Sequence, residues 1–149
     1  MEPPRWAVDE MLGRLARYLR FLGYDAEYLR GRSDAEILVL LRADPRVLLT
    51  RDRRLAGQVP GSVLLTRRDL EGQLRELRGF YPSLRTEPRF DRCAVCNIPL
   101  APEPSDPGDG PRPPHRWCPT CGRHYWEGSH TARIRASFAH LLPGGGDPA

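Results

Sequence analysis

The chain has 149 residues, enough for one compact domain or for one domain and a small module, and its content of 40% hydrophobic and 28% charged residues excludes a disordered protein. Its formal net charge is +4 and all 23 basic residues are arginines, which suits a phosphate-rich partner, although genome composition explains the arginine bias equally well. The longest apolar run, Ile37 to Leu41, is too short for a membrane span, and Asp9 interrupts the place of a secretory signal. We therefore expect a cytoplasmic protein with no membrane partner.

Residues 1 to 80 alternate short apolar runs with helical segments, a pattern that predicts β-α units around a parallel sheet. The expected strands are Arg5–Asp9, Tyr24–Leu29, Arg46–Thr50 and Ser62–Thr66. The last two contain continuous apolar triplets, as central strands covered on both faces do. Polar and apolar residues alternate in the second strand, which places it nearer an edge.

Helices are expected between these strands. Leucines at helical spacing from Leu12 to Leu22 predict a first helix that ends at Gly23. Its opposite face carries three arginines: Arg14, Arg17 and Arg20. Ser33 and Glu36 have the spacing of a capping box that starts a second helix. A short helix follows the third strand, and another begins near residue 69.

Carboxylates follow the strands at the edge of the sheet where ligands bind in open parallel sheets. Four aspartates map to that edge: Asp9, Asp34, Asp52 and Asp69. Carboxylate oxygens are the ligands that Mg2+ and Mn2+ prefer, so the pattern favours a divalent-metal site. Helix N-termini also attract acidic residues and lie at the same edge, so capping alone explains such a cluster equally well.

The capping requirements separate these four residues. The capping box described above satisfies the second helix, and Thr50 can cap the third, which leaves Asp34 and Asp52 available for function. Asp9 suits an ordinary N-cap. Asp69 has the spacing of a capping box that begins at residue 66, so we expect Asp69 to be structural.

Four cysteines form the strongest local motif, C-x2-C-x21-C-x2-C: Cys93, Cys96, Cys118 and Cys121. In a reducing compartment this spacing favours a tetrahedral zinc site over disulfides, with a redox pair or free thiols as the alternatives. Four thiolates fill the coordination shell and leave no position for an activated water. We therefore predict a structural zinc ion.

The sequence divides into an α/β domain over residues 1–82 and a zinc ribbon over residues 90–142. Residues 99–114 hold seven prolines and are expected to form a mobile loop, and a last helix is expected to begin after Ser129. Trp117, Tyr125 and Trp126 flank the second cysteine pair and are expected to form the core of the ribbon, with base stacking as the alternative. His130 is assigned no metal, because the cysteines suffice.

Five segments, taken in order, carry a resemblance to a known family: Val8 to Arg20, Leu22 to Asp25, Leu48 to Arg53, Arg92 to Asn97, and Cys118 to His130. Together they closely resemble the Mut-seven C-terminal RNase family over most of residues 5 to 135. The resemblance implies a PIN-like nuclease fold, in which helices flank a parallel sheet, followed by a four-cysteine zinc ribbon.

The resemblance also implies roles for the acids. Asp9, Asp34 and Asp52 match the positions that hold metal in PIN nucleases. Asp34 is preferred to Glu36, whose capping role competes. Asp69 is the only nearby candidate for the fourth acid of the PIN pattern.

The implied activity is hydrolysis of RNA phosphodiester bonds with Mg2+ or Mn2+ at these aspartates. The metal lowers the pKa of a bound water and neutralises charge at phosphorus, so no covalent nucleophile is needed. Arg14, Arg17 and Arg51 are expected to bind the phosphate backbone, although arginines on a helix face are usually solvated. The alternatives are a noncatalytic zinc-ribbon RNA-binding or adaptor protein, and an enzyme for DNA or a small phosphoester. The sequence predicts neither the oligomeric state nor the choice between internal and terminal cleavage.

Overall fold

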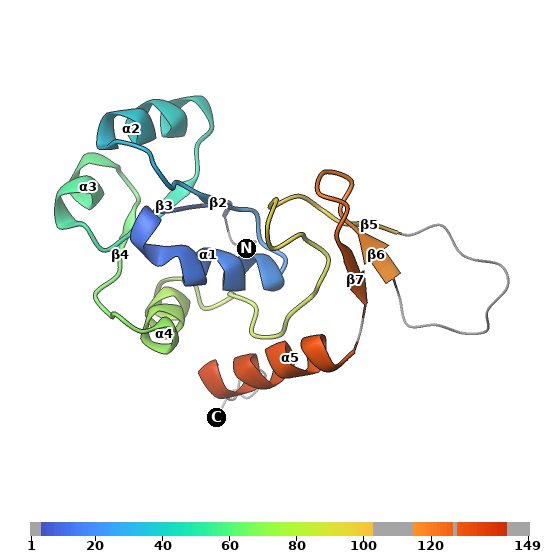
Figure 1. The fold of residues 1–149 in the computed structure, drawn as a ribbon. Helices are drawn as coiled ribbons and strands as arrows, with labels where there is room; N and C mark the ends of the chain where they lie inside the picture. Colours follow the sequence, from blue (N-terminus) through green and yellow to red (C-terminus); the bar gives the residue numbers. More distant parts are fainter. Residues whose placement is uncertain (1–3, 103–114, 127, 143–149) are drawn as a thin grey trace, which may run out of the picture.

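The structure is a computed structural model that describes residues 4–102, 115–126 and 128–142 (Figure 1). Its first part contains β1 (Trp6–Val8), the 3-10 helix η1 (Glu10–Leu12), α1 (Gly13–Phe21), β2 (Ala26–Tyr28), α2 (Asp34–Ala43), β3 (Val47–Thr50), α3 (Arg53–Gln58), β4 (Val63–Leu64) and α4 (Leu70–Phe80). The strands form a parallel sheet in the order β2-β1-β3-β4. The predicted α/β fold and the positions of the four strands are confirmed, with shorter strands than expected.

The order of the strands corrects one expectation. In the described sheet β1 and β3 are central, and β2 lies at an edge as predicted. The last strand lies at the other edge, so the central position expected for Ser62–Thr66 is wrong. Val63 and Leu65 are buried in the core with α1 and α4, which explains the apolar run without a strand on each side. A continuous apolar run therefore indicates that residues of a strand are buried. It does not indicate whether the strand is central or at an edge of the sheet.

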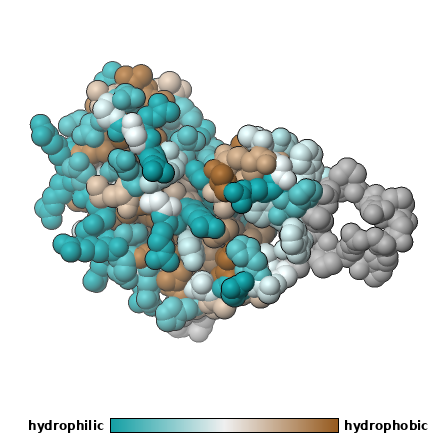
Figure 2. Space-filling view, viewed as in Figure 1, coloured by the Kyte–Doolittle hydropathy of each residue, from teal (hydrophilic) through white to brown (hydrophobic). Residues whose placement is uncertain are grey.

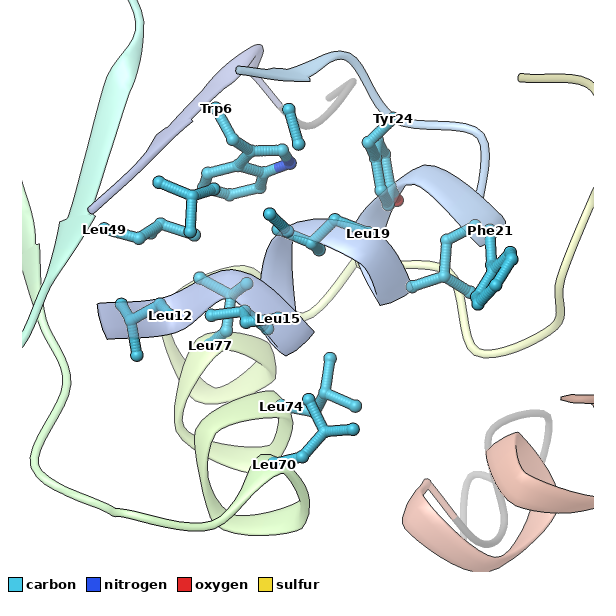
Figure 3. Close-up of a cluster of buried hydrophobic side chains, with 14 of the residues drawn as sticks. Trp6, Leu12, Leu15, Leu19, Phe21, Tyr24, Leu49, Leu70, Leu74 and Leu77 are labelled. Atoms are coloured by element: carbon cyan, nitrogen blue, oxygen red, sulfur yellow. The ribbon is translucent and has the colours of Figure 1, made fainter. Parts of the chain in front are cut away.

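The two faces of the sheet are covered by different helices. Trp6 and Leu49 point to the face covered by α1 and α4, where they pack above the leucines of both helices (Figure 3). Ala7 and Leu48, one position away along each strand, pack with residues of α2 and α3 on the other face. This alternation follows from the two-residue period of a strand. The helices cover the central strands on both faces, whereas Glu27 of the edge strand β2 is exposed. Ligands of open parallel sheets bind at the carboxyl ends of the strands.

The C-terminal part begins with a three-stranded antiparallel sheet of β5 (Ala101–Pro102), β6 (His115–Trp117) and β7 (His124–Trp126), in that order. β5 falls within the predicted mobile loop and pairs with β6, so that expectation is wrong for residues 101–102. The rest of the predicted loop, residues 103–114, lies outside the described residues.

The last helix, α5 (Ser129–Leu141), is confirmed, although Gly128 and not Ser129 is its N-cap. Ile134 and Phe138 are buried in the same core as the residues of α1 and α4, and the rings of Phe138 and Tyr18 lie 5.1 Å apart. The chain therefore returns to the α/β core after the cysteine-containing segment. None of the helices in the described ranges is long and apolar enough to cross a membrane.

Asp25, just before β2, forms a partly buried ion pair with Arg46. The Arg46 Nη1 and Nη2 atoms donate to the two carboxylate oxygens at 2.7 and 3.3 Å, and Asn97 Nδ2 donates to Oδ1 at 2.7 Å. Burial raises the pKa of Asp25, but the hydrogen bonds from Arg46 and Asn97 outweigh burial and hold the pKa below its ordinary value. The carboxylate is thus the form that the fold prefers.

The lowered pKa of Asp25 determines how the stability of the protein changes with pH. The folded pKa of Asp25 lies below the unfolded one, so its contribution is present above the unfolded pKa and is lost as the pH falls through the folded pKa. Asp25→Asn is expected to lower the free energy of unfolding at neutral pH and to flatten its fall between about pH 5 and 2. Urea unfolding at successive pH values measures both. Glu71→Gln, which removes a surface ion pair with Arg75, is the control; a variant of Asp25 with the wild-type slope contradicts the prediction.

Candidate active site and zinc centre

Asp9 lies where β1 ends. Its backbone N–H donates to the Leu49 carbonyl at 3.0 Å, which ties the residue to β3. The side chain is only 8% exposed and caps η1: Oδ1 accepts the Glu10 N–H at 2.8 Å. Oδ2 accepts the Thr50 hydroxyl at 2.6 Å. The carboxylate is therefore held in place at the carboxyl ends of the two central strands.

Thr50 is the residue that sequence reasoning missed. It is the last residue of β3 and fully buried. Its hydroxyl donates to Asp9 and accepts the N–H of Asp52 at 3.0 Å, so one side chain joins the two aspartate segments. The prediction that Thr50 caps α3 is wrong. The available signal is the Thr50-Arg51-Asp52 spacing, because a threonine hydroxyl readily accepts from the amide two residues ahead.

Asp52 caps α3 in place of Thr50. Its Oδ1 accepts the N–H groups of Arg54 and Leu55 at 2.9 and 3.3 Å. Asp52 therefore has a structural role, contrary to the expectation from the sequence. No described residue donates a hydrogen bond to Oδ2, so the capping carboxylate keeps one oxygen for a ligand. The neighbouring Arg51 has a buried Nε with no acceptor among the described residues.

Asp34 and Asp69 differ in their capping roles, as the sequence predicts. Asp34 is the exposed first residue of α2, whose cap is Ser33 in a complete capping box with Glu36, so Asp34 itself is not needed as a cap. Asp69 is the N-cap of α4 and accepts the Gly72 N–H at 3.2 Å. Its structural role is confirmed, but it does not close a box with residue 66, whose amide and hydroxyl bind Glu76 instead.

The three predicted metal-holding aspartates share one edge of the sheet without forming a compact ligand cluster. Asp9 and Asp52 follow the adjacent strands β1 and β3, and Asp34 begins the helix after β2, the other neighbour of β1. Among the described residues, the four cysteines are the group in which three or more potential metal-ligand atoms lie within 4.8 Å of one another. The aspartates do not form such a group. Thr50 joins the Asp9 carboxylate to the backbone of the Asp52 segment, and the metal-holding roles of the three aspartates stay predictions.

The four cysteines converge as the zinc prediction requires. Their sulfur atoms all lie within 4.8 Å of one another, and the Sγ atoms of Cys93 and Cys121 are 3.8 Å apart. The Cys96 amide donates to the first sulfur of its pair at 3.3 Å, and the Cys121 amide donates to Cys118 Sγ at 3.4 Å. Four soft sulfur donors at this spacing fit tetrahedral Zn2+ and leave no open position, so the cluster can hold a structural zinc ion.

The surroundings of Cys93 favour the thiolate that zinc requires. Burial raises the pKa of this thiol, but hydrogen bonds from the Tyr125 hydroxyl, 3.2 Å from Sγ, and from the amides of Cys96 and Val95 outweigh burial and lower the pKa to about 7. Tyr125 therefore supports a cysteine ligand, in addition to packing in the ribbon. Such hydrogen bonds to ligand atoms orient them and tune the metal.

The first cysteine pair is fixed to the α/β part by two side chains. Arg20 is buried, which corrects its predicted exposure; it donates to the carbonyls of Ala26 at 2.9 Å and Ala94 at 2.9 Å. Asn97, at a φ of 59°, accepts the Ala26 N–H at 2.9 Å and donates to Asp25. Asparagine is among the few residues that tolerate this left-handed conformation. The zinc centre is thus hydrogen-bonded to the edge strand β2.

The comparison with protein families agrees with this geometry. The family model described as the Mut7-C RNAse domain matches residues 4–138, which is nearly the whole chain. The chain belongs to the Mut7-C RNase domain family. The resemblance found in the sequence motifs is confirmed, and membership makes this a chain of a nuclease-like family. No curated protein matches the chain. No solved structure matches it.

In this Mut7-C RNase domain the predicted phosphate-binding arginines belong to the chain segments that carry Asp9 and Asp52. Arg14 and Arg17 are exposed on α1, which follows the Asp9 segment directly. Arg51 lies between Thr50 and Asp52. Hydrophilic side chains dominate the surface of the α/β part in Figure 2. The roles of these three arginines stay predictions, and the same holds for the metal-holding roles of the aspartates.

Proposed function

We propose that this chain is a divalent-metal-dependent ribonuclease that hydrolyses RNA phosphodiester bonds at the sheet edge carrying Asp9, Asp34 and Asp52. The observation that supports it most is the hydroxyl of Thr50, which holds the buried carboxylate of Asp9 against the Asp52 segment. The Asp9 carboxylate accepts one hydrogen bond at each oxygen but forms no ion pair with a described residue, so a cation would stabilise its buried charge. Membership in an RNase domain family makes a phosphodiester the natural substrate.

The carboxylates of Asp9 and Asp52 would hold Mg2+ or Mn2+, with Asp34 as the third acid. A divalent ion bound there lowers the pKa of a coordinated water and neutralises charge on the phosphate. Thr50 fixes the direction of the Asp9 oxygens. Helix α3 fixes Oδ1 of Asp52 through two amide hydrogen bonds and leaves Oδ2 for the ligand. The chain thus contributes two preoriented acids, which reduces the reorganisation that the reaction needs.

The substrate is bound by donors next to these acids. Arg51, which precedes Asp52 in the chain, would bind a phosphate oxygen, and Arg14 and Arg17 continue the basic surface along α1. Hydrolysis adds one water across the P–O bond: the water oxygen joins phosphorus, the bond to the leaving oxygen breaks, and that oxygen gains a proton. No residue of the chain needs to form a covalent bond with the substrate.

Cleavage assays on purified, zinc-loaded protein test this proposal. We expect single-stranded RNA to be cut with Mg2+ or Mn2+ and not in their absence, and we expect Ca2+ to support little cleavage because it prefers more ligands and looser geometry. Parallel reactions with DNA of the same sequence and with a simple phosphodiester separate a ribonuclease from the other two phosphoesterases. RNA that stays intact with both metals contradicts the proposed function.

A noncatalytic RNA-binding or adaptor protein is the second candidate. It is favoured by the finding that Asp9 and Asp52 both cap helices and so already have a structural role. This alternative predicts salt-dependent RNA binding that is lost with the zinc ion, and no cleavage under any metal condition. The cleavage assay above therefore decides between the two.

A further inference from the structure

A cavity of about 560 Å³ lies between the zinc ribbon and the helices α1 and α5. The C-terminal half of α1 contributes Arg17 and Phe21 to its wall, and the segment between the first two cysteines contributes Val95. The remainder comes from the second cysteine turn, β7 and the first turns of α5. Its volume lies in the range of small-molecule binding sites, and it is separate from the aspartates at the strand ends.

The wall of this cavity combines apolar and basic groups. Phe21 and Ile134 belong to the buried core beneath it, whereas Arg17 and Arg123 are exposed at its border. Two histidines also line it, and no acidic residue is found among the described lining residues. Arg17 and Arg123 therefore give their part of the wall a positive charge that suits an anion.

Trp126 gives the cavity an exposed aromatic surface. Its side chain is 57% exposed, so the expectation that it forms the core of the ribbon is wrong. Val95, on the opposite cysteine turn, is also 57% exposed, and both residues line the cavity. In Figure 2 hydrophobic surface lies among hydrophilic side chains where the ribbon meets the rest of the molecule. Large apolar side chains exposed together in this way are typical of binding sites.

We infer that this cavity binds one nucleotide of a single-stranded nucleic acid, with the base against Trp126 and the adjoining phosphates against Arg17 and Arg123. A nucleotide combines a flat apolar surface with a negative charge, which is the combination that the wall offers. An apolar side chain of a protein partner would fill the floor but would bury the arginines without counter-charges, at a cost in binding free energy.

The cavity and the aspartate edge are connected by α1, and this step rests on the proposed function. The helix begins four residues after Asp9, and at 1.5 Å per residue Arg17 lies about 6 Å along the axis from its first residue. A strand bound to the arginines of this helix therefore runs from the aspartates toward the cavity. The cavity would hold a nucleotide away from the bond that is cut, and so contribute to substrate binding and not to the chemical step.

Fluorescence anisotropy with short labelled oligoadenylates, in RNA and DNA form, tests the inference on the zinc-loaded full chain without added Mg2+ or Mn2+. Trp126→Ala is expected to weaken binding by about fivefold to a hundredfold, and Trp126→Phe to keep most of the affinity. Arg17→Gln and Arg123→Gln are each expected to reduce the slope of log affinity against log salt by about 0.7, which Trp126→Ala leaves unchanged. Phe80→Ala, an exposed aromatic on α4, and Arg42→Gln on α2 are matched controls.

The outcomes separate this inference from the proposed function. Wild-type affinity in Trp126→Ala and Arg123→Gln, or an equal loss in Phe80→Ala and Arg42→Gln, overturns the nucleotide site and leaves the cavity to another class of ligand. Tight, Trp126-dependent binding by a protein that cuts no RNA supports the nucleotide site while the nuclease proposal fails. The ratio of RNA to DNA affinity shows which strand the site prefers.

Discussion

Asp9→Asn and Asp52→Asn are each expected to lower the rate of RNA cleavage by about a hundredfold or more while the protein stays folded. A metal ion contributes several kcal/mol to the stabilisation of a phosphoryl transition state, and each 1.36 kcal/mol lost is about tenfold in rate. Asparagine keeps the size of aspartate and is an equally good N-cap, so both helices remain capped. Cleavage of labelled RNA at saturating Mn2+ and thermal unfolding, measured on the same preparations, separate the effect on chemistry from the effect on folding.

Asp69→Asn is the matched control, because Asp69 caps α4 in the same way, and this capping role is the one that we assign to the only nearby candidate for a fourth acid. We expect it to keep wild-type cleavage.

Two variants of Thr50 test the hydroxyl that joins Asp9 to the backbone of Asp52. Thr50→Val removes this hydroxyl, whereas Thr50→Ser keeps it. The first is expected to reduce both cleavage and stability, and the second to reduce neither by much. Undiminished cleavage in Asp9→Asn and Asp52→Asn contradicts the catalytic role of this edge.

Loss of the zinc ion is expected to have the largest effect on stability, and this effect should reach the α/β part. Structural zinc sites contribute about 10 to 16 kcal/mol of apparent binding free energy in small peptides, so the ribbon is expected to unfold without metal. Arg20 then loses the Ala94 carbonyl beside Cys93 and keeps only the Ala26 carbonyl, while Ala26 and Asp25 lose their hydrogen bonds to the Asn97 side chain. We expect Cys118→Ser, or removal of zinc by a chelator, to lower the melting temperature by roughly 10 °C or more.

Calorimetry together with a measurement of bound zinc checks this prediction. Asn97→Gly is the useful comparison, because glycine adopts the positive φ of this position but cannot bond Ala26 or Asp25. It should keep its zinc and lose about 1 to 3 kcal/mol of stability. A zinc-free protein whose α/β part melts at the wild-type temperature would show that the two parts are not coupled.

The local patterns of the sequence predicted the elements well. The spacing of leucines from Leu12 to Leu22 and the positive-φ glycine at position 23 set the extent of α1, and the Ser33–Glu36 box set the start of α2. The cysteine spacing predicted the cluster that the structure shows. The helix signals lie within one or two turns, so neighbouring side chains and backbone groups decide them without help from the rest of the fold. The cysteine pairs are separated by 21 residues, and the requirement of one metal ion for four ligands predicts that they meet.

The errors involve contacts between distant segments. The hydroxyl of Thr50 could cap α3 or bind elsewhere, and a carboxylate 41 residues earlier in the chain determines which. The periodicity of α1 places Arg20 on the polar face of the helix. Its guanidinium is nevertheless buried, because it donates a hydrogen bond to the carbonyl of Ala94, 74 residues later. Trp126 was expected to be buried because a small ribbon needs a core. Its exposure depends on how the ribbon sits against α1 and α5, which periodicity does not describe.

Because α5 packs in the α/β core, the ribbon is inserted between two helices of that core, α4 and α5, and is not a separate C-terminal module. The chain leaves the core after α4, forms the cysteine turns and their strands, and then supplies Ile134 and Phe138 to the hydrophobic layer that it left. Cutting the chain after α4 therefore deletes part of the wall around Tyr18, along with the zinc ligands. To excise the ribbon cleanly, an engineer would have to join α4 to α5 with a linker that spans the length of α5, because Gly79 near the end of α4 lies beside Leu142 at the far end of α5.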